Sequence, residues 1–501
     1  MKTAMIGLTA LGTMAFTASF AGAAAQAIDL DDSPFALGTL SAEEGALGQD
    51  VWQGADPDAL ATLLDALPRA YAEPAYLDIA RRLLLSPASA PEGADDALAG
   101  AKLLAAAELG YYREAGQLAE LAPQLSGQPA LTKVAALSAL LDGDVRRACA
   151  RGARLTQGRA DPFFLRLRYL CYVDAGEAAA ADLTLGLLRD QGLGEGTDRV
   201  FTALQTAGDL GGTVSPADAF EYAGAQMAGA AVGTGAVAEL SGSVLAAVAR
   251  DADAATGLRL PALERALSLG LIGASEGQRL AAEMAETALA ADVVAVATER
   301  PGSPGSAEAI ARSLRAAPTY DAFRARAILH ADALRASDPV IGYAPDADVL
   351  ALASIIAGDE RAAGAWLAAM RSEAGADPGA YEALTGLLRL ANGTERAVSV
   401  PLSDPMAATG TGIADLVDSA LSAARGGAPG AAALVALTGL GVDADGEAEA
   451  IRESVVLAML DQSGLAGEVA KRAALDIQAA SVFAQLSGGG EPVPRMKPGN
   501  P

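Results

Sequence analysis

The segment Leu137–Ala148 reads LSALLDGDVRRA, and it shares one spacing with LAAAELGYYREA from Leu104 and with LCYVDAGEAAAA from Leu170. In each copy a Leu is followed by five residues, a Gly, four more residues and an Ala, and successive copies are offset by 33 residues. The spacing returns further along the chain, and Gly393 begins a partial fifth copy. The full copies are Leu104, Gly110 and Ala115; Leu137, Gly143 and Ala148; Leu170, Gly176 and Ala181; and Leu352, Gly358 and Ala363.

This spacing predicts a pair of helices joined by a tight turn. The Leu would point inward from the first helix, the Gly would end that helix where a positive φ is needed, and the Ala would let the second helix cross closely. One such hairpin cannot bury its apolar face alone, so neighbouring hairpins must stack, as in an α-solenoid. Ala-rich helices also give chance matches, but two identical offsets with all three positions kept argue against that explanation.

On these positions the chain resembles tetratricopeptide repeats, in the period and in the turn from Gly to Ala. The resemblance covers about residues 95–195 and, more weakly, 345–400, and it lacks the aromatic positions and the closing Pro of each repeat. It implies a protein-interaction scaffold with a concave face. The Ala-rich composition also resembles that of uncharacterised secreted proteins of Gram-negative bacteria with GC-rich genomes, a resemblance that implies no activity.

The rest of the chain also favours helices. Leu60, Leu63, Leu64 and Leu67 repeat with helical spacing behind Asp56-Pro57, an N-cap followed by the helical position that tolerates Pro. Asp161-Pro162 and Ser215-Pro216 are expected to open helices in the same way. Only the runs 293–296 and 398–402 resemble strands. We therefore predict an all-α fold, an α-solenoid of stacked helical hairpins.

The predicted organisation follows composition and turn residues. The linker is expected at Arg300–Ser306, which is rich in Pro, Gly and Ser. The expected segments are a signal peptide (1–27), an irregular N-terminal cap (28–54), a helical repeat block (55–210), an Ala/Gly-rich helical segment (211–300), a second repeat block (301–400), C-terminal helices (401–486) and a disordered tail (487–501).

Charge and the first residues indicate a compartment and exclude some partners. The 501 residues carry a net charge of −26, which disfavours nucleic acids and anionic membrane surfaces. Lys2, an apolar stretch and Ala25-Gln26-Ala27 follow the pattern of a cleaved export signal. We expect a protein of the periplasm, or one released outside the cell, without stable membrane insertion after cleavage.

The two cysteines are expected to meet. Cys149 follows the repeat Ala148 and Cys171 follows the repeat Leu170, so stacked hairpins would place them on adjacent helices. In an exported chain this predicts a structural disulfide, with two buried free thiols as the alternative. No C-x-x-C motif suggests redox catalysis.

Catalytic motifs are weak. His330 is the single histidine, which excludes sites built from two or more histidines, and its helical context suggests a partly exposed residue on a helix face. Gly273-Ala-Ser275-Glu-Gly277 matches a nucleophile elbow, with Asp321 and His330 following in hydrolase order. A helix-like segment precedes it instead of a strand, and Ser275 with Gln278 also fits a capping box.

No cofactor or metal is expected. Asp443-Ala-Asp445-Gly446 resembles a calcium loop, but its Gly comes too early and no Glu stands at position twelve. Gly410-Thr-Gly412 and Gly439-Leu-Gly441 lack a preceding strand, and no Walker-type lysine follows a Gly-rich turn. Carboxylates are too numerous here for a pair of them to indicate a glycosidase.

Three functional hypotheses follow. The leading one is a non-catalytic helical-repeat scaffold that mediates protein–protein interactions in the bacterial envelope, with envelope or periplasmic proteins as partners. The second is a structural spacer subunit, which predicts stoichiometric co-purification with an envelope assembly. The third is a periplasmic hydrolase that uses Ser275, and in that case Ser275→Ala would abolish its activity.

Overall fold

The computed structural model describes residues 33–71, 73–122, 127–206, 213–337, 344–372, 377–393, 422–423, 426–441, 456, 459–460 and 467–488. The described chain is helical apart from one pair of two-residue strands, as the sequence predicts. The α-helices are α1 (Pro57–Asp65), α2 (Pro74–Leu85), α3 (Asp96–Ala106), α4 (Tyr112–Leu121), α5 (Pro129–Leu141), α6 (Val145–Ala153), α7 (Pro162–Asp174), α8 (Ala178–Asp190), α9 (Glu195–Thr206), α10 (Ala219–Met227), α11 (Gly242–Arg250), α12 (Thr256–Ser268), α13 (Ala274–Glu283), α14 (Ala288–Thr298), α15 (Pro304–Arg315), α16 (Tyr320–Leu329), α17 (Ala331–Ala336), α18 (Ala347–Ile356), α19 (Glu360–Ser372), α20 (Pro378–Ala391), α22 (Pro429–Thr438) and α24 (Gly467–Leu486). The 3-10 helices are η1 (Pro34–Ala36), η2 (Ala42–Glu44), η5 (Thr234–Ala238), η6 (Ala344–Asp346) and η8 (Gly439–Gly441), and η3 (Ala107–Tyr111) is a π-helical turn.

Acidic N-caps followed by Pro start helices where the sequence predicts them. Asp56 accepts a hydrogen bond from the Ala59 amide at the start of α1, and Asp161 caps α7 through the Phe163 amide. The prediction at Ser215-Pro216 is displaced, because α10 begins at Ala219 behind Asp218. Asp218 bonds two amides, and this stronger cap sets the start of the helix.

The two runs that resembled strands do not form the strand pair. Residues 293–296 lie within α14, and residues 398–402 lie outside the described residues. The parallel pair instead joins β1 (Thr213–Val214) to β2 (Ala231–Val232) on either side of α10. The predicted linker Arg300–Ser306 is also shorter than expected, because Ser303 caps α15 and the helix begins at Pro304.

At three of the four full repeats, the Gly joins two helices with the positive φ that the spacing predicts. Three of the repeat glycines, Gly143, Gly176 and Gly358, join α5 to α6, α7 to α8 and α18 to α19 with φ of 76°, 71° and 72°. The repeat alanines are buried, and so are the repeat leucines except Leu104, which is partly exposed. The buried alanines are Ala115, Ala148, Ala181 and Ala363, and the buried leucines are Leu137, Leu170 and Leu352.

Gly110 differs from the other repeat glycines. It has φ 119° and ψ −5° inside η3, and the chain turns there from α3 to α4. A Cβ at Gly110 would lie 2.8 Å from the backbone oxygen of Gly242 and 2.8 Å from Leu271 Cδ2, whereas a Cβ at Gly176 would meet nothing within 4 Å. The first repeat is therefore bent by the close approach of α11.

Replacing Gly110 or Gly176 by alanine should lower the free energy of unfolding by unequal amounts, although the two glycines hold equivalent positions in the repeat. Gly176→Ala adds only the strain of a left-handed conformation and should lower the free energy of unfolding by about 1 kcal/mol. Gly110→Ala adds a backbone clash and should lower it by about 3 kcal/mol. Urea unfolding of the two variants measures the difference, and equal losses would contradict the packing of η3 on α11.

The predicted disulfide is present. Cys149 of α6 and Cys171 of α7 are bonded with a Cα–Cα distance of 5.7 Å, and the structure shows no free cysteine in the described residues. The alternative of two free thiols is therefore wrong. The bond joins the second helix of one hairpin to the first helix of the next.

Removing this bond should destabilise the α5–α8 region. Cys149→Ala with Cys171→Ala frees a 22-residue loop, and the free energy of unfolding should fall by about 3 kcal/mol in the chain-entropy model. Urea unfolding with and without dithiothreitol measures this effect. The reductant should weaken the native protein and leave the double variant unchanged; a reductant effect on both would show that it acts elsewhere.

The described residues form three hydrophobic cores. The largest joins α1–α5 to α10–α14 and also includes buried residues of α22 and α24. A second core lies within α15–α20 and takes in part of α24, and a third joins α5–α10. The helices before residue 211 therefore share two of these cores with the helices after it.

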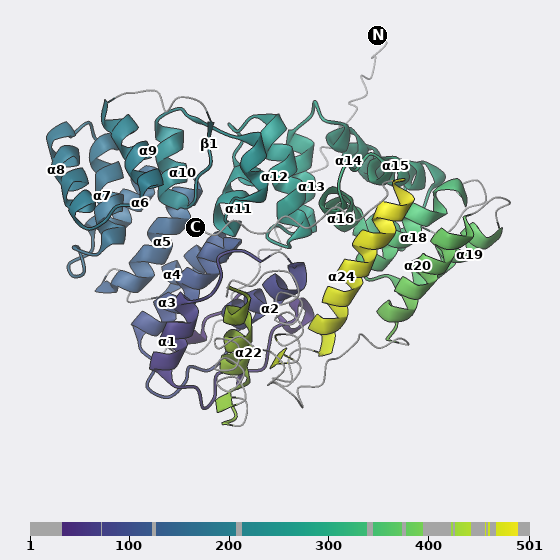
Figure 1. Cartoon of the computed structure of the whole chain (residues 1–501), viewed down its shortest axis with the longest axis horizontal. Coiled ribbons are helices and arrows are strands. Elements are labelled where there is room, and N and C mark those ends of the chain that lie inside the picture. Colours follow the sequence, from purple (N-terminus) through teal and green to yellow (C-terminus); the bar gives the residue numbers. More distant parts are fainter. Residues whose placement is uncertain are drawn as a thin grey trace, which may run out of the picture.

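Two C-terminal helices return to the start of the chain. In Figure 1 the helices run from α8 at one side to α19 at the other, while α24 crosses between α2 and the α16–α18 region. Helix α22 packs against α1 and α2, and α24 packs against α2, α16, α18 and α20. This return places residues from both ends of the described chain side by side.

A buried lysine, Lys102, bonds the first described segment of the chain to α3. Residues 33–54 form η1, η2 and turns. Lys102 of α3 is 1% exposed, and its Nζ donates to the backbone oxygens of Phe35 at 2.6 Å and Leu37 at 3.4 Å. The ammonium also lies 4.6 Å from the centre of the Phe35 ring. Burial lowers the pKa of Lys102 to about 7.

Candidate ligand cleft

A cleft of about 480 Å³ lies where the returning helix α24 meets the rest of the molecule. Its walls come from α2, the C-terminal end of α12, α16, the turn between α18 and α19, and one face of α24. Figure 1 shows α24 beside these elements. The volume lies in the range of small-ligand sites, so the cleft is the candidate functional site.

One end of the cleft is cationic. Arg81 of α2 and Lys471 and Arg472 of α24 line it together with Asp78. The Asp78 carboxylate lies 2.9 Å from Arg472 Nη1 and 3.8 Å from Arg81 Nε, so one carboxylate serves two guanidinium groups. This end of the cleft therefore carries more positive than negative charge in a chain that is strongly acidic overall.

Among the cations that line the cleft, Lys471 has no protein partner within the described residues. It is partly buried, and no hydrogen bond or ion pair joins its amine to the part of the chain that the structure describes. By contrast, Lys102 donates to two backbone oxygens, and Lys133 Nζ lies 2.7 Å from Asp161 Oδ2. The Lys471 amine is thus available to a ligand.

The inner wall is fixed by Asp476 of α24. Its carboxylate accepts a hydrogen bond from the Tyr320 hydroxyl at 2.7 Å and pairs with Arg324 of α16. Arg324 Nε also donates to the Ser268 backbone oxygen at the end of α12, at 2.9 Å. Burial raises the pKa of Tyr320 and lowers that of Arg324. This network joins α24 to α16 and α16 to the end of α12.

Another part of the cleft is aliphatic. Ile328 of α16, Ile355 and Ile356 of α18, and Leu475 and Ala479 of α24 line it. On α24 the lining changes along one helix face, because positions 471 and 472 are basic while 475 and 479 are apolar. A ligand lying along α24 would meet charge at one end and hydrocarbon at the other.

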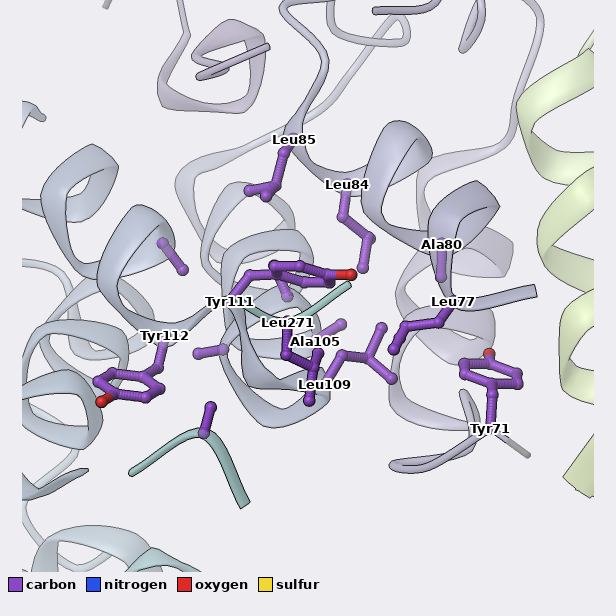
Figure 2. Packing of buried hydrophobic residues seen from close by; sticks show 14 of the residues in the cluster. Tyr71, Leu77, Ala80, Leu84, Leu85, Ala105, Leu109, Tyr111, Tyr112 and Leu271 are labelled. Atoms are coloured by element: carbon purple, nitrogen blue, oxygen red, sulfur yellow. The ribbon is translucent and has the colours of Figure 1, made fainter. Parts of the chain in front are cut away.

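The bend at Gly110 orients two adjacent tyrosines differently. Figure 2 shows Tyr111 and Tyr112 pointing away from one another, with Tyr111 on the side of Leu84. Tyr111 lines the cleft, and burial raises its pKa, so the phenol stays neutral. The Tyr112 ring lies 5.2 Å from the guanidinium carbon of Arg250, which is paired with Glu276. The atypical repeat turn thus contributes one wall residue to the cleft.

The structure does not join Ser275 and Asp321, two of the hydrolase candidates, by a hydrogen bond. Ser275 is exposed in the first turn of α13 and forms no side-chain hydrogen bond with the described residues. Asp321 accepts from Arg265 Nη1 at 3.0 Å and from Ser268 Oγ at 3.1 Å. The element before Ser275 is helix α12.

The capping box predicted at Ser275 is not formed. Gly273 is the N-cap of α13 and no side chain caps it, while Gln278 Nε2 donates to the Leu329 backbone oxygen at 2.6 Å. The tertiary contact with α16 takes the amide that a capping box would need.

His330 is buried, and the prediction of a partly exposed position is wrong. It follows α16, is 2% exposed, and its Nε2 lies 3.1 Å from Ser313 Oγ. Burial lowers its pKa to about 4, with a smaller contribution from Arg326. The ring lies against Ser313 of α15, a tertiary contact that the local helical pattern does not reveal.

The other motifs singled out in the sequence lie outside the described residues or in a short helix. Residues 410–412 and 443–446 lie outside the described residues, and residues 439–441 form η8. Among the described residues, no group of three or more His, Cys, Asp or Glu side chains is arranged to hold a metal ion.

Sequence reasoning missed the cleft, because its walls come from segments up to about 400 positions apart. Arg472 and Asp78, for example, are separated by 394 positions. One signal in the sequence was the rarity of lysine, which occurs at only five positions, one of them in an otherwise amphipathic C-terminal segment. That signal marks Lys471 without showing what it faces.

Comparison with known proteins gives no match to a family model, to a curated protein or to a solved structure. None of the described helices is both long and apolar enough to cross a membrane.

Proposed function

We propose that this protein is a non-catalytic, exported helical scaffold that binds a partner protein in the bacterial envelope, and that the cleft beside α24 receives the partner. The cleft carries the proposal, because it combines a cationic end, an aliphatic wall and about 480 Å³ of space. The hairpins around Gly143, Gly176 and Gly358 would serve as tetratricopeptide-like units that support it.

Compartment and charge support this proposal. A disulfide in the described chain is compatible with an oxidising compartment such as the periplasm. The net charge of −26 disfavours nucleic acid and anionic membrane surfaces, so a protein partner is the more suitable ligand.

Site-specific photo-crosslinking in the native host tests the proposal. A photoreactive residue at Ile356, in the cleft, should capture a discrete partner, whereas the same residue at exposed Arg371 on α19 should not. Capture of the same proteins from both positions, or of none from Ile356, would overturn the proposal. Stoichiometric co-purification with an assembly, without capture from the cleft, would favour the spacer function.

A further inference from the structure

Resting on the proposed function, we infer that the cleft binds an aliphatic carboxylate, with Lys471 as the counter-ion of the carboxylate and the isoleucine-lined wall as the site of the hydrocarbon. Such a group occurs in two sources, the carboxyl terminus of a polypeptide that ends in Leu, Ile or Val and a free fatty acid. The shared chemistry is one negative charge at the end of a branched or linear aliphatic group.

The charge of the ligand follows from the cations that remain available. Arg324 is engaged by Asp476, and Arg472 by Asp78, whereas Lys471 has no partner within the described chain. Arg81 pairs with Asp78 at 3.8 Å, and its Nη2 also donates to the Glu44 backbone oxygen at 3.3 Å, so Lys471 is the counter-ion that the inference needs. Lysine and arginine donors form charge-assisted hydrogen bonds to carboxylates.

A single negative charge fits better than the double charge of a phosphate monoester. The C-terminal ends of α12 and α18 both border the cleft, at Leu269–Gly270 and Ala357–Gly358. Helix C-termini carry partial negative charge, and Glu360 adds a carboxylate at the rim. These groups oppose a second negative charge on the ligand.

The aliphatic part of the ligand is inferred from the apolar side chains that line the cleft. Ile328, Ile355, Ile356 and Leu475 face the same space as the cations but offer no hydrogen bond from their side chains. Hydrocarbon placed against them is removed from water, which favours binding in proportion to the area covered. A polar anion such as sulfate or citrate would leave this wall uncovered.

Titration calorimetry of the full-length protein tests the inference with decanoate below its micelle concentration and with the peptide acetyl-Ala-Ala-Leu bearing a free carboxylate. At least one of them should bind at one site per chain. Decanol, decylamine and the amidated peptide are the matched ligands without the negative charge, and they should bind at least 10-fold more weakly. Tighter binding of the peptide would identify a polypeptide terminus as the source, and tighter binding of decanoate a fatty acid.

The variants assign the site. Lys471→Met should weaken carboxylate binding about 10-fold, and Lys471→Arg should restore it to within about threefold. Arg371→Met removes one exposed positive charge from α19, outside the cleft, and should leave the affinity unchanged. Equal affinity of decylamine and decanoate, no saturable binding of either carboxylate, or wild-type affinity in Lys471→Met would each overturn the inference.

The experiments distinguish a failure of the carboxylate inference from a failure of the proposed function. If Ile356 captures a partner and neither decanoate nor the peptide with a free carboxylate binds, the scaffold stands and the carboxylate assignment fails. If decanoate binds through Lys471 and no partner is captured, the cleft is a small-molecule site and the scaffold proposal fails.

Discussion

The variant Lys102→Met should be more stable than the native protein at pH 6, by about 2 kcal/mol; the advantage should vanish at about pH 8.5, and above that pH the native protein should be the more stable of the two. Lys102 is fully enclosed between α3 and η1, and burial lowers its pKa to about 7, from 10.5 for a solvated lysine. Below pH 7 the folded protein must hold a buried ammonium.

The direction of the change in stability with pH follows from the number of protons bound by the folded and unfolded chains. Between pH 7 and 10.5 the unfolded chain holds a proton on Lys102 that the folded chain has released, so native stability rises with pH in that window. A shift from 10.5 to about 7 corresponds to about 5 kcal/mol. Methionine removes this free-energy penalty of burying the ammonium. It also leaves the Phe35 and Leu37 backbone oxygens without their donor, which costs about 1–3 kcal/mol.

Urea unfolding of both proteins at pH 6, 7, 8, 9 and 10 measures the prediction. The difference in the free energy of unfolding should change by about 1.4 kcal/mol per pH unit in the window, while titrations common to both proteins cancel. Lys133→Met, at a lysine paired with Asp161 on the protein surface, is the control and should show no such slope. A pH-independent difference for Lys102→Met would contradict the burial of the charge.

A second large effect is expected at the ion pair between α12 and α16. Glu264 and Arg326 are both buried, and Glu264 Oε1 accepts from Arg326 Nε at 2.9 Å and from Nη2 at 2.7 Å. Among the described residues, Glu264→Ala leaves the Ser313 backbone oxygen as the single remaining acceptor of the guanidinium. The free energy of unfolding should fall by about 3–5 kcal/mol, because the charge is buried without its counter-ion.

The double variant Glu264→Leu with Arg326→Met separates charge from packing. It removes both charges and keeps the volume, so its stability should return to within about 1 kcal/mol of the native value. Asp332→Ala breaks the exposed pair with Arg335 and should change stability by less than about 0.5 kcal/mol. A double variant as unstable as Glu264→Ala would show that packing, and not the unpaired charge, causes the loss.

Local rules predicted a large part of the fold. Asp followed by Pro marks the starts of α1 and α7, and the glycines of the repeat have positive φ because any other residue would be strained there. The disulfide was predictable because it joins neighbouring hairpins. In each case the determining residues lie within about one repeat of one another.

The errors share a different cause. Gly110 has the same local sequence pattern as Gly143, yet its turn is reshaped by Gly242 of α11. His330 is enclosed, and Gln278 is drawn to Leu329, through contacts between α13, α15 and α16. The cleft depends on a helix that returns across the whole molecule. Such contacts depend on chain topology, which a periodic pattern does not encode.

The return of α24 also sets an order on the synthesis of the protein. Arg472 reaches Asp78 across 394 positions, so the α2 side of the cleft can be completed only after almost the entire described chain has left the ribosome. Until then the faces of α2, α16 and α18 that α24 covers are open to solvent. A contact of this separation forms slowly compared with the local hairpins. The candidate cleft is therefore completed late in folding, and a chain that ends before α24 lacks one of its walls.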